Sequence, residues 1–363
     1  MTKYSNTKAT IAIAKASFRS IIRSPSAVVF SLAFPLIFIV VFANIGGGAI
    51  GMDVGVAKTC DTTNGIYRAL QQYKMIHLIT DQSSADMASN LSKGSIDAII
   101  NIQKNPTVPP ITLNIQYTKA SAQKDGILQS LLNDLFYRIN SAASSAPQPV
   151  AEIKATTVSG REYKYIDFIL PGMLGFSLLS SGVFGTAFVF LSLRLTLVIK
   201  RFFATPVKKY SIVLGEAIAR LVFSWIGALF IITVGHYFFD FTLVHGLTTV
   251  VNMLALSAIG LIIFMGFGFI ISGIAKNEST IPPLSNIITM PQFLLSGTFF
   301  ATTAFPHWLQ SLSNILPLTY LNHAMRQVAF EGAGLGDVTH DMLILGIWFI
   351  IVYAAAVKTF KWE

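Results

Sequence analysis

Few side chains in this sequence have the type and spacing that chemistry requires. Glu216 and Arg220 are four residues apart with the acid first, the order in which such residues pair on one face of a helix. They lie near the start of an apolar run, where charged residues are rare and often functional. The spacing fits two interpretations, a structural ion pair and a role in transport.

Other reactive residue types occur singly. Cys60 is the only cysteine, which excludes an intramolecular disulfide and any multi-cysteine metal site. His77 is the only histidine between residues 47 and 164, and no nucleophile–base pair is recognisable there. The sequence contains no G-x-x-x-x-G-K-S/T phosphate loop. We therefore expect no catalytic residue, no metal ligand and no cofactor bound by this chain.

The composition is that of a membrane protein. Of 363 residues, 53% are hydrophobic and 12% are charged, against roughly 25% charged in a soluble domain. With a mean hydropathy of +0.62, one soluble core could not bury this much apolar surface. This excludes a typical cytosolic enzyme. The net charge of +9 does not indicate nucleic acid, because the bases flank apolar runs.

Uncharged apolar runs long enough to cross about 30 Å of hydrocarbon predict six spans. They cover residues 27–45, 168–193, 221–239, 247–275, 281–300 and 342–357. The predicted fold class is an α-helical membrane protein with six transmembrane helices and an inserted extracytoplasmic α/β domain. The predicted parts are an interfacial helix at 1–24, transmembrane helix 1 at 25–46, the α/β domain at 47–164 and helices 2–6 at 165–363.

Lysine and arginine counts set the orientation. Residues 1–24 and residues 194–210 each hold five bases and no acid, which assigns both to the cytoplasm. With six crossings, both termini are cytoplasmic and 47–164 is extracytoplasmic. A cleaved signal peptide is the alternative for the N-terminus, but an apolar run of about 19 residues exceeds the usual core of such peptides, so we favour an uncleaved anchor.

The N-terminal segment has helical periodicity. Apolar residues recur along one stripe and bases along its flank, which predicts a helix in the inner headgroup layer rather than a disordered basic leader. The apolar residues are Ile11, Ala14, Phe18, Ile21 and Ile22, and the bases are Lys8, Lys15, Arg19 and Arg23.

Alternating short apolar segments and polar helical segments predict the small α/β domain. Strands are expected at 52–57, 75–79, 96–102 and 111–117, with a further one at 152–160. Helices are expected at 63–73, 83–94 and 121–142. A Ser/Ala/Pro-rich linker covers 141–152.

Two spans have features beyond hydrophobicity. The second is rich in glycine and serine, including Ser181 and Gly185 at small-xxx-small spacing, which favours close helix packing and is also compatible with a lining role in a pathway. In the fifth, Pro291 predicts a kink or break between 289 and 292, with Asn286, Gln292 and Ser296 on a water-accessible face. Residues 301–340 are too polar to span and are expected to form short re-entrant or interfacial helices, with Trp308 and Tyr320 at headgroup level.

Three stretches resemble the permease subunits of the type 2 family of ABC exporters, in the subgroup with a large extracytoplasmic domain between helices 1 and 2. They are FRSIIRSPSAVVFSLAFPLIFIVVF at 18–42, RLTLVIKRFFATPVKKYSIVLGEAIAR at 194–220 and MPQFLLSGTFFATTAFPHWLQSLSNILPLTYLNHAMRQV at 290–328. The third is the most specific. The second departs from the family, which often has a Glu and a Gly before the basic residues.

The resemblance implies an export permease in the cell (cytoplasmic or inner) membrane, paired with a second permease subunit as a homodimer or heterodimer. ATP and Mg would be bound by a separate ABC ATP-binding subunit, and no nucleic acid is involved. The residues implied for coupling to that subunit are Phe18, Arg19, Arg23, Lys200, Arg201, Phe202, Thr205 and Pro206. The residues implied for the substrate path are Phe176, Ser180, Phe184, Asn286, Pro291, Gln292 and Ser296.

Two other function classes are compatible with a membrane protein of this layout. A membrane-anchored receptor or assembly factor would use the outer domain for binding, but it would not need a broken fifth helix. An ion-coupled carrier is disfavoured because inverted repeats and deep acids are absent from the sequence. An amphiphilic or lipid-like substrate or a drug suits an apolar path, while peptide and polysaccharide remain open.

Overall fold

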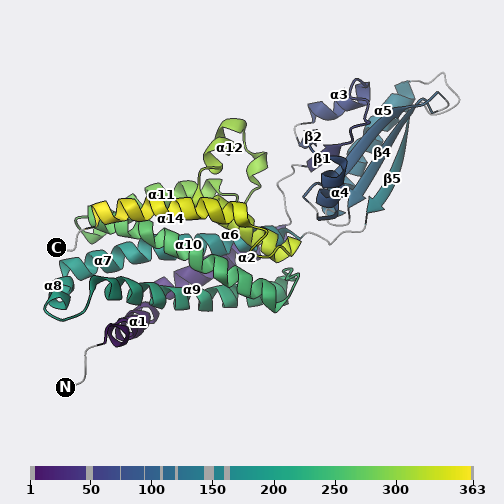
Figure 1. The fold of residues 1–363 in the computed structure, drawn as a ribbon. Coiled ribbons are helices and arrows are strands. Elements are labelled where there is room, and N and C mark those ends of the chain that lie inside the picture. The colour runs from purple at the N-terminus through teal and green to yellow at the C-terminus, as the bar shows by residue number, and fades with distance from the viewer. Residues whose placement is uncertain are drawn as a thin grey trace. The chain divides into compact units, whose positions relative to one another are not determined.

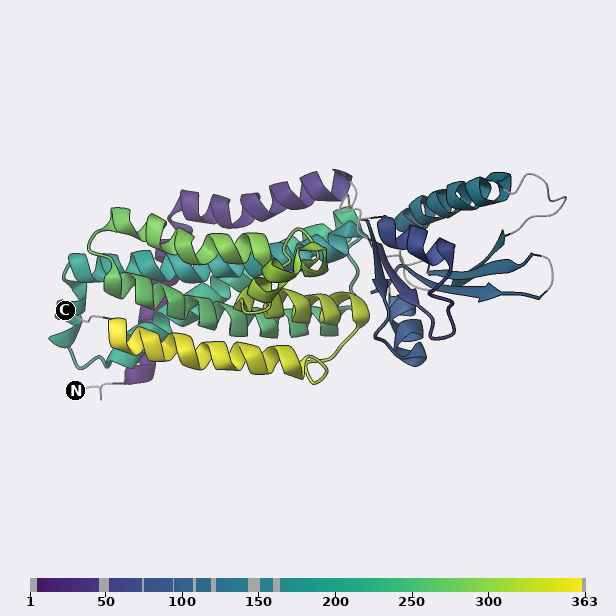
Figure 2. The same ribbon diagram turned by 90° about the horizontal axis from the view of Figure 1, so that it is seen from above.

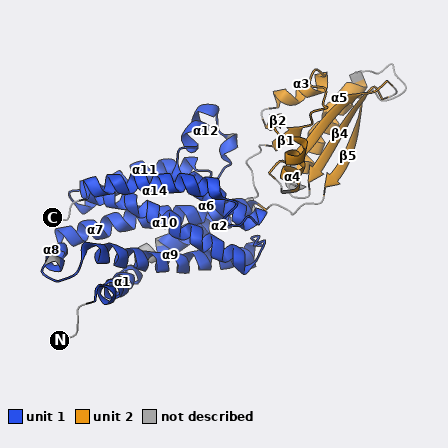
Figure 3. Ribbon diagram, in the orientation of Figure 1, with its two compact units in different colours: residues 1–46, 165–363 blue, residues 47–164 orange. Residues whose placement is uncertain are grey.

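The structure is a computed structural model that describes residues 5–45, 52–73, 75–93, 95–106, 109–118, 122–142, 151–158 and 164–360. The chain divides into two compact units (Figure 3). Unit 1 comprises residues 1–46 and 165–363 and is helical, while unit 2 comprises residues 47–164 and contains the sheet (Figure 1).

The longer helices of unit 1 run alongside one another in two perpendicular views, whereas the N-terminal helix runs across them (Figure 2). The α-helices are α1 (Asn6–Ile22), α2 (Pro25–Ile45), α6 (Tyr165–Ser180), α7 (Thr186–Leu195), α8 (Val198–Phe203), α9 (Lys209–Phe239), α10 (Leu247–Ile274), α11 (Ile281–Leu295), α12 (His307–Ser313), α13 (Pro317–Arg326) and α14 (Thr339–Thr359). Turns of π-helix occur at η2 (Ser181–Gly185) and η5 (Gln327–Glu331), and turns of 3-10 helix at η3 (Glu278–Thr280) and η4 (Thr302–Ala304).

Within the described residues, 4 helices are long and apolar enough to cross a bilayer. They are the continuous helix Tyr165–Leu195, α9, α10 and α14. α2 has 21 residues, of which Ser31–Phe42 form a described apolar stretch, and α11 has only 15 residues. Four of the six predicted spans are thus confirmed as helices of sufficient length and hydropathy. The span predicted at 27–45 corresponds to α2, which is as long as α14, and the span predicted at 281–300 corresponds to the shorter α11.

Of the predicted kink or break at 289–292, the break is wrong, and the kink stays a prediction. Pro291 lies inside α11, and the helix continues to Leu295. Pro291 has no amide hydrogen, so α11 lacks one intrahelical hydrogen bond at this residue. Pro282 and Pro283 cost no such bond, because they lie in the first turn of the helix. The chain leaves the helix at Gly297, whose φ of 69° is a conformation that glycine adopts without strain. The predicted short helices after residue 301 are present as η4, α12, α13 and η5.

Unit 2 is a five-stranded sheet in the order β2-β1-β3-β4-β5. Its strands are β1 (Met52–Val56), β2 (Ile76–Ile79), β3 (Ala98–Lys104), β4 (Ile111–Thr118) and β5 (Ala151–Val158). Only the β3–β4 pair is antiparallel. Helices α3 (Gly65–Gln72), α4 (Ser84–Lys93) and α5 (Ala122–Ala142) connect the strands, so the predicted α/β order is confirmed. Most of the predicted linker, residues 143–150, lies outside the described residues.

The core of unit 2 follows the alternation of β4. Leu113, Ile115 and Tyr117 are buried, and Leu128 and Leu132 of α5 belong to the same buried cluster. The spacing of four in α5 and of two in β4 is that of one helix face against one sheet face.

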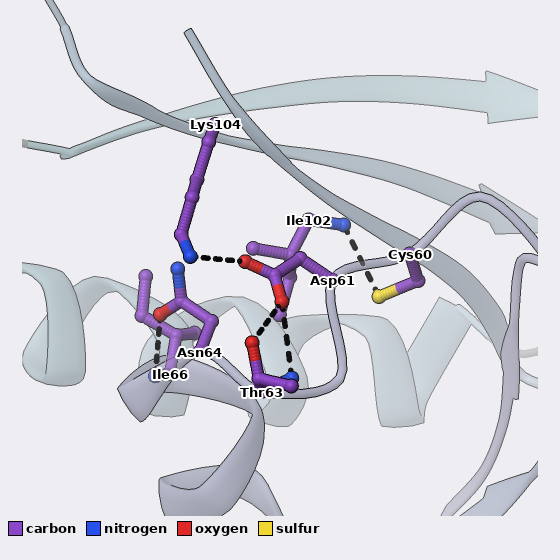
Figure 4. A network of polar contacts seen from close by, with 7 residues as sticks. All are labelled: Cys60, Asp61, Thr63, Asn64, Ile66, Ile102 and Lys104. Atoms are coloured by element: carbon purple, nitrogen blue, oxygen red, sulfur yellow. Dashed lines mark hydrogen bonds and ion pairs between the residues drawn. The ribbon is translucent and has the colours of Figure 1, made fainter.

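A polar network fixes the loop that follows β1 (Figure 4). Asp61 pairs with Lys104 at 3.0 Å and accepts hydrogen bonds from the backbone N and Oγ1 of Thr63 at 3.0 and 2.6 Å. These bonds, those of Thr63 foremost, lower the pKa of Asp61. Ile102 N donates to Cys60 Sγ at 3.3 Å, and burial raises the pKa of this thiol. Asn64 caps α3 through Ile66 N. The network ties the β1–α3 loop to β3, which gives Cys60 a structural setting.

Asp125 in the first turn of α5 generates a prediction about pH. Burial, and then the charge of Asp97, raise its pKa from 3.8 to about 7. A raised pKa means that the folded unit holds this proton more tightly than the unfolded chain, so stability is highest below pH 4 and falls as the pH rises through about 7. Asp125→Asn should remove this loss.

The measurement is hydrogen exchange of α5 and β4 peptides in the full-length protein between pH 5 and 8, after correction for intrinsic exchange. Asp134→Asn, an exposed acid of the same helix, is the matched control. Equal pH dependence of protection in the parent and in Asp125→Asn would contradict the prediction.

Candidate functional site

A buried stretch of non-helical backbone follows α11. Residues 296–299 are all buried, and the carbonyl oxygens of Ser296, Gly297 and Phe299 accept side-chain hydrogen bonds. Asn322 Nδ2 donates to Ser296 O at 3.1 Å, and Tyr165 OH donates to Phe299 O at 2.5 Å. Arg326 Nη2 donates to Gly297 O. Three side chains from two elements distant in sequence, α6 and α13, thus supply donors that this backbone needs away from water.

Arg326 also anchors the segment to α6. Its Nε donates to Phe168 O at 3.0 Å, and its guanidinium carbon lies 3.7 Å from the centroid of the Phe168 ring. A guanidinium presents several donors in one plane, which lets a single side chain bind two carbonyls and an aromatic face together.

Two glycines of α6 allow this approach. A Cβ at Gly172 would lie 2.8 Å from Thr298 O, and a Cβ at Gly175 would overlap Asn322 Oδ1 and lie 2.8 Å from Leu318 Cδ1. Any larger residue would push the 296–299 segment or α13 away. The prediction that small residues in the second span permit close packing is confirmed here.

Aromatic rings join α2, α6 and α11. Phe176 and Phe293 have ring centroids 4.1 Å apart, Phe34 lies 5.2 Å from Phe176, and Phe299 lies 4.8 Å from Phe293. We call this set, completed by Phe38 and Phe42 of α2, the aromatic cluster. Such ring pairs favour tilted and edge-to-face contacts at these separations. α2 and α11 are therefore attached to α6 through the aromatic cluster.

The predicted path residues do not share one surface. Phe176 lies in the aromatic cluster, while Ser180 and Phe184, at the end of α6 and in η2, are half-buried. The predicted path residues in and directly after α11 lie on two different faces.

Gln292 and Ser296 are buried, whereas Asn286 and Pro291 are exposed. Gln292 Nε2 donates to Ile288 O at 3.3 Å. Its Oε1 and the hydroxyl of Ser296 are buried without a hydrogen-bond partner among the described residues. The structure thus brings Phe176 to α11 through Phe293 and leaves Asn286 and Pro291 on the outer face of α11.

The predicted coupling residues lie on two short elements. In α1, Phe18 is half-buried, and Arg19 and Arg23 at its end are exposed. In and after α8, Lys200, Arg201, Thr205 and Pro206 are exposed, Phe202 is half-buried and Ile199 is buried. Thr205 Oγ1 donates to Phe202 O at 2.7 Å, which closes the end of α8. Both elements therefore present bases outward and hold apolar side chains inward.

The contact between α1 and α9 is set by a glycine. A Cβ at Gly215 would lie 2.7 Å from Ile13 Cγ2, so α1 lies directly against α9 at this position. The predicted helix is present, but Thr10 and Ala14 are buried while Ile11 and Ile22 are 60% and 52% exposed. Thr10 can face α9 because its hydroxyl donates to Asn6 O, 3.0 Å away.

Sequence reasoning missed Tyr165, Asn322 and Arg326. Each is polar and stands in or next to a segment assigned to the interface, where a polar side chain needs no special partner. Their acceptors are between 26 and 158 residues away in sequence. The one signal was that the most specific family-like stretch ends with this asparagine and arginine.

A comparison with protein families gives the assignment. The model of the ABC-2 family transporter protein matches residues 25–358. The chain belongs to the ABC-2 family. It is a membrane-embedded transporter permease.

The relatives of this ABC-2 permease include transport proteins of two organisms. "ABC transporter G family member 20" of Dictyostelium discoideum is 24% identical over 96% of this chain and 50% of that protein. "Inner membrane transport permease YadH" of Escherichia coli is 25% identical over 55% of this chain and 75% of that protein. "Probable multidrug ABC transporter permease YbhR" is 22% identical over 42% of this chain and 39% of that protein. The chain spans half the length of the Dictyostelium relative.

The glycine contact in this ABC-2 permease can be tested directly. Gly175→Ala should lower stability by about 1–3 kcal/mol, because the added methyl forces buried Asn322 and Leu318 apart. The measurement is thermal unfolding in detergent. Gly346→Ala in α14, where a Cβ meets nothing within 4 Å, is the control and should be neutral or slightly stabilising. Equal stability losses in both variants would contradict the role of Gly175.

Proposed function

We propose that this chain is the permease subunit of an ATP-driven exporter that moves an amphiphilic or lipid-like substrate or a drug out of the cytoplasm or the inner leaflet. The carrying observation is that α1 and α8 both expose bases. Both helices are short, expose only bases among their charged residues, and lead into or contact α9. Such a surface suits a soluble motor subunit that pushes on the bundle.

The motor is a separate ABC ATP-binding subunit, which binds ATP and Mg. The sequence of this chain has no phosphate loop, and none of its described residues form a group of three or more metal-type ligands. The residues that would contact the motor are those predicted from the sequence: Phe18, Arg19, Arg23, Lys200, Arg201, Phe202, Thr205 and Pro206. Exposure of every base in this set supports the proposal.

The proposed topology has six crossings in the cytoplasmic membrane, with both termini inside and residues 47–164 outside. α11 makes a short crossing. At 1.5 Å per residue, the 15 residues of α11 span about 22 Å, less than the hydrocarbon thickness of about 30 Å. The buried segment 296–299 would cover the remaining depth, and its satisfied carbonyls make that feasible.

The substrate path would run between α6 and α11 of two permease subunits. Phe176 and Ser180 of α6 and Phe184 of η2 would line one wall, and the exposed Asn286 and Pro291 of α11 the other. Gln292 and Ser296, which are buried on a different face, stay candidates for the path. The exposed large side chains on the outer face of α11, Ile287 at 71% and Leu294 at 56%, support contact with a second subunit or with lipid beside Asn286 and Pro291. An apolar path of this kind suits an amphiphile better than an ion.

Topology can be tested with the native cysteine. Cys60 is half-buried, so it should react with a small membrane-impermeant thiol reagent in intact cells. A cysteine introduced by Lys208→Cys in a Cys60→Ser background should react only after lysis, because residue 208 would be cytoplasmic. Labelling at position 208 in intact cells would reverse the proposed orientation.

Coupling can be tested at α8. Arg201→Glu with Pro206→Gly should preserve expression and subunit pairing but separate transport from ATP hydrolysis, because charge complementarity and loop stiffness are both lost. The readouts are a pull-down of the ATP-binding subunit and ATPase activity in lipid vesicles.

Lys276→Glu is the matched control, since Lys276 is an exposed base outside α1 and α8. If no ATP-binding protein co-purifies with the parent chain, a membrane-anchored receptor or assembly factor becomes the better interpretation. Unchanged substrate-stimulated hydrolysis in the double variant would exclude a role of α8 in coupling.

A further inference from the structure

α9 contains an ion pair inside the helix bundle. Arg220 Nη2 lies 2.7 Å from Glu216 Oε1, and the two side chains are only 5% and 3% exposed. Replacing a buried ion pair by apolar residues of similar size is often neutral or stabilising, so stability alone does not account for its presence. Ionisable groups inside a membrane bundle call for a functional explanation.

Arg220 reaches beyond its partner to η2. Its Nη1 donates to Ser181 O at 3.2 Å. η2 is a single turn of π-helix, and such turns shift the hydrogen-bond register and are frequent at functional sites. A Cβ at Gly185 would overlap Arg220 Nη1 and lie 2.7 Å from its Cζ, so glycine is required at this position for the guanidinium to enter.

η2 is held as closely by α10. A Cβ at Gly182 would lie 2.6 Å from Phe264 Cβ, and a Cβ at Gly268 would lie 2.7 Å from Val183 O and 2.8 Å from Gly182 O. Interiors packed at this density transmit displacement instead of absorbing it. A movement of α9 therefore displaces η2 relative to α10 or breaks the bond from Arg220.

η2 carries residues of the proposed path. Phe184 belongs to it, and Ser180 immediately precedes it at the end of α6. The cytoplasmic end of the proposed connection is the start of α9. This helix begins at Lys209, three residues after Pro206 in the turn that follows α8. One continuous helix thus runs from the coupling surface to the guanidinium that touches η2.

We propose that Arg220, oriented by Glu216, is a positioning residue that transmits movement of α9 to η2 and so sets the position of Ser180 and Phe184 in response to ATP. This inference rests on the proposed function. Glu216 neutralises the guanidinium and directs it, and Ser181 O and Gly185 form its receiving surface.

The test places a cysteine by Ser180→Cys in a Cys60→Ser background and measures its labelling rate by a small thiol reagent. The sample is the complex with its ATP-binding subunit in lipid vesicles, with and without ATP and vanadate. The labelling rate in this background should change severalfold on nucleotide trapping. In Glu216→Met/Arg220→Met the change should be lost while ATP hydrolysis continues.

Two further variants separate transmission from folding. Gly185→Ala deletes no polar group but displaces the guanidinium, and it should also abolish the nucleotide-dependent change. Arg194→Met is the matched control: Arg194 Nη2 donates to Ala275 O at 2.6 Å, so the variant removes a comparable arginine–carbonyl bond away from α9, and it should keep the change. Arg220→Lys retains the charge but cannot contact Glu216 and Ser181 O together. It should therefore show only part of the nucleotide-dependent change in labelling rate.

The proposal is overturned if both the double-methionine variant and Gly185→Ala keep the nucleotide-dependent change in labelling rate. It is also overturned if the Ser180→Cys background shows no such change in a complex that hydrolyses ATP. If the double-methionine variant does not fold, Gly185→Ala and Arg220→Lys decide the question. Absence of any associated ATP-binding subunit is a different result, since it removes the proposed function itself.

Discussion

The unit 1 fold depends on satisfying backbone carbonyls that leave a helix while still buried. α11 ends at Leu295, and the next four residues lie in the interior, where an unpaired carbonyl is costly. Tyr165, Asn322 and Arg326 each bring a donor to one of these carbonyls. The positions of α6 and α13 are constrained by this requirement, because each of them supplies one or more of the donors.

Glycine sets the distances that this arrangement needs. Gly172 and Gly175 admit the non-helical segment, Gly215 admits α1, and Gly185 admits the Arg220 side chain. In a bilayer, where lipid competes on equal terms for apolar contact, close backbone approach is one of the few sources of helix association. The same residue type thus serves packing between helices and access for a charged side chain.

Prediction from sequence succeeded where the determinants are local. The strands and helices of unit 2 follow from alternation and helical spacing, and β5 at Ala151–Val158 was recovered from a short polar strand pattern. The Glu216–Arg220 pair follows from one turn of helix. A kink or break was predicted at 289–292, whereas α11 continues through Pro291 to Leu295, because a proline in a helix is tolerated or not according to its neighbours. Donors such as Arg326 act across more than a hundred residues, and no periodic pattern reports such a contact.

The path residues illustrate the same limit. Periodicity places Gln292 and Ser296 on a polar face of α11, and both are polar residues at buried positions. It does not say whether that face meets water, a second subunit or the interior of the same chain. Asn286 and Pro291 point the other way, so one helix offers two candidate surfaces.

The π-turn at η2 fixes the number of residues between the two halves of the helix Tyr165–Leu195. A π-turn holds about one residue more than the α-turn it replaces, so the two halves of the 31-residue helix Tyr165–Leu195 are rotated by about 100° relative to an uninterrupted helix. Gly175, before η2 in the chain, faces Asn322, and Phe190, after η2, is buried. Both residues have these orientations only because the π-turn contains its additional residue. Loss of one residue between 181 and 185 would turn one half of the helix away from its partners. Insertions and deletions, which most loops of a protein tolerate, are therefore excluded from the middle of this membrane helix.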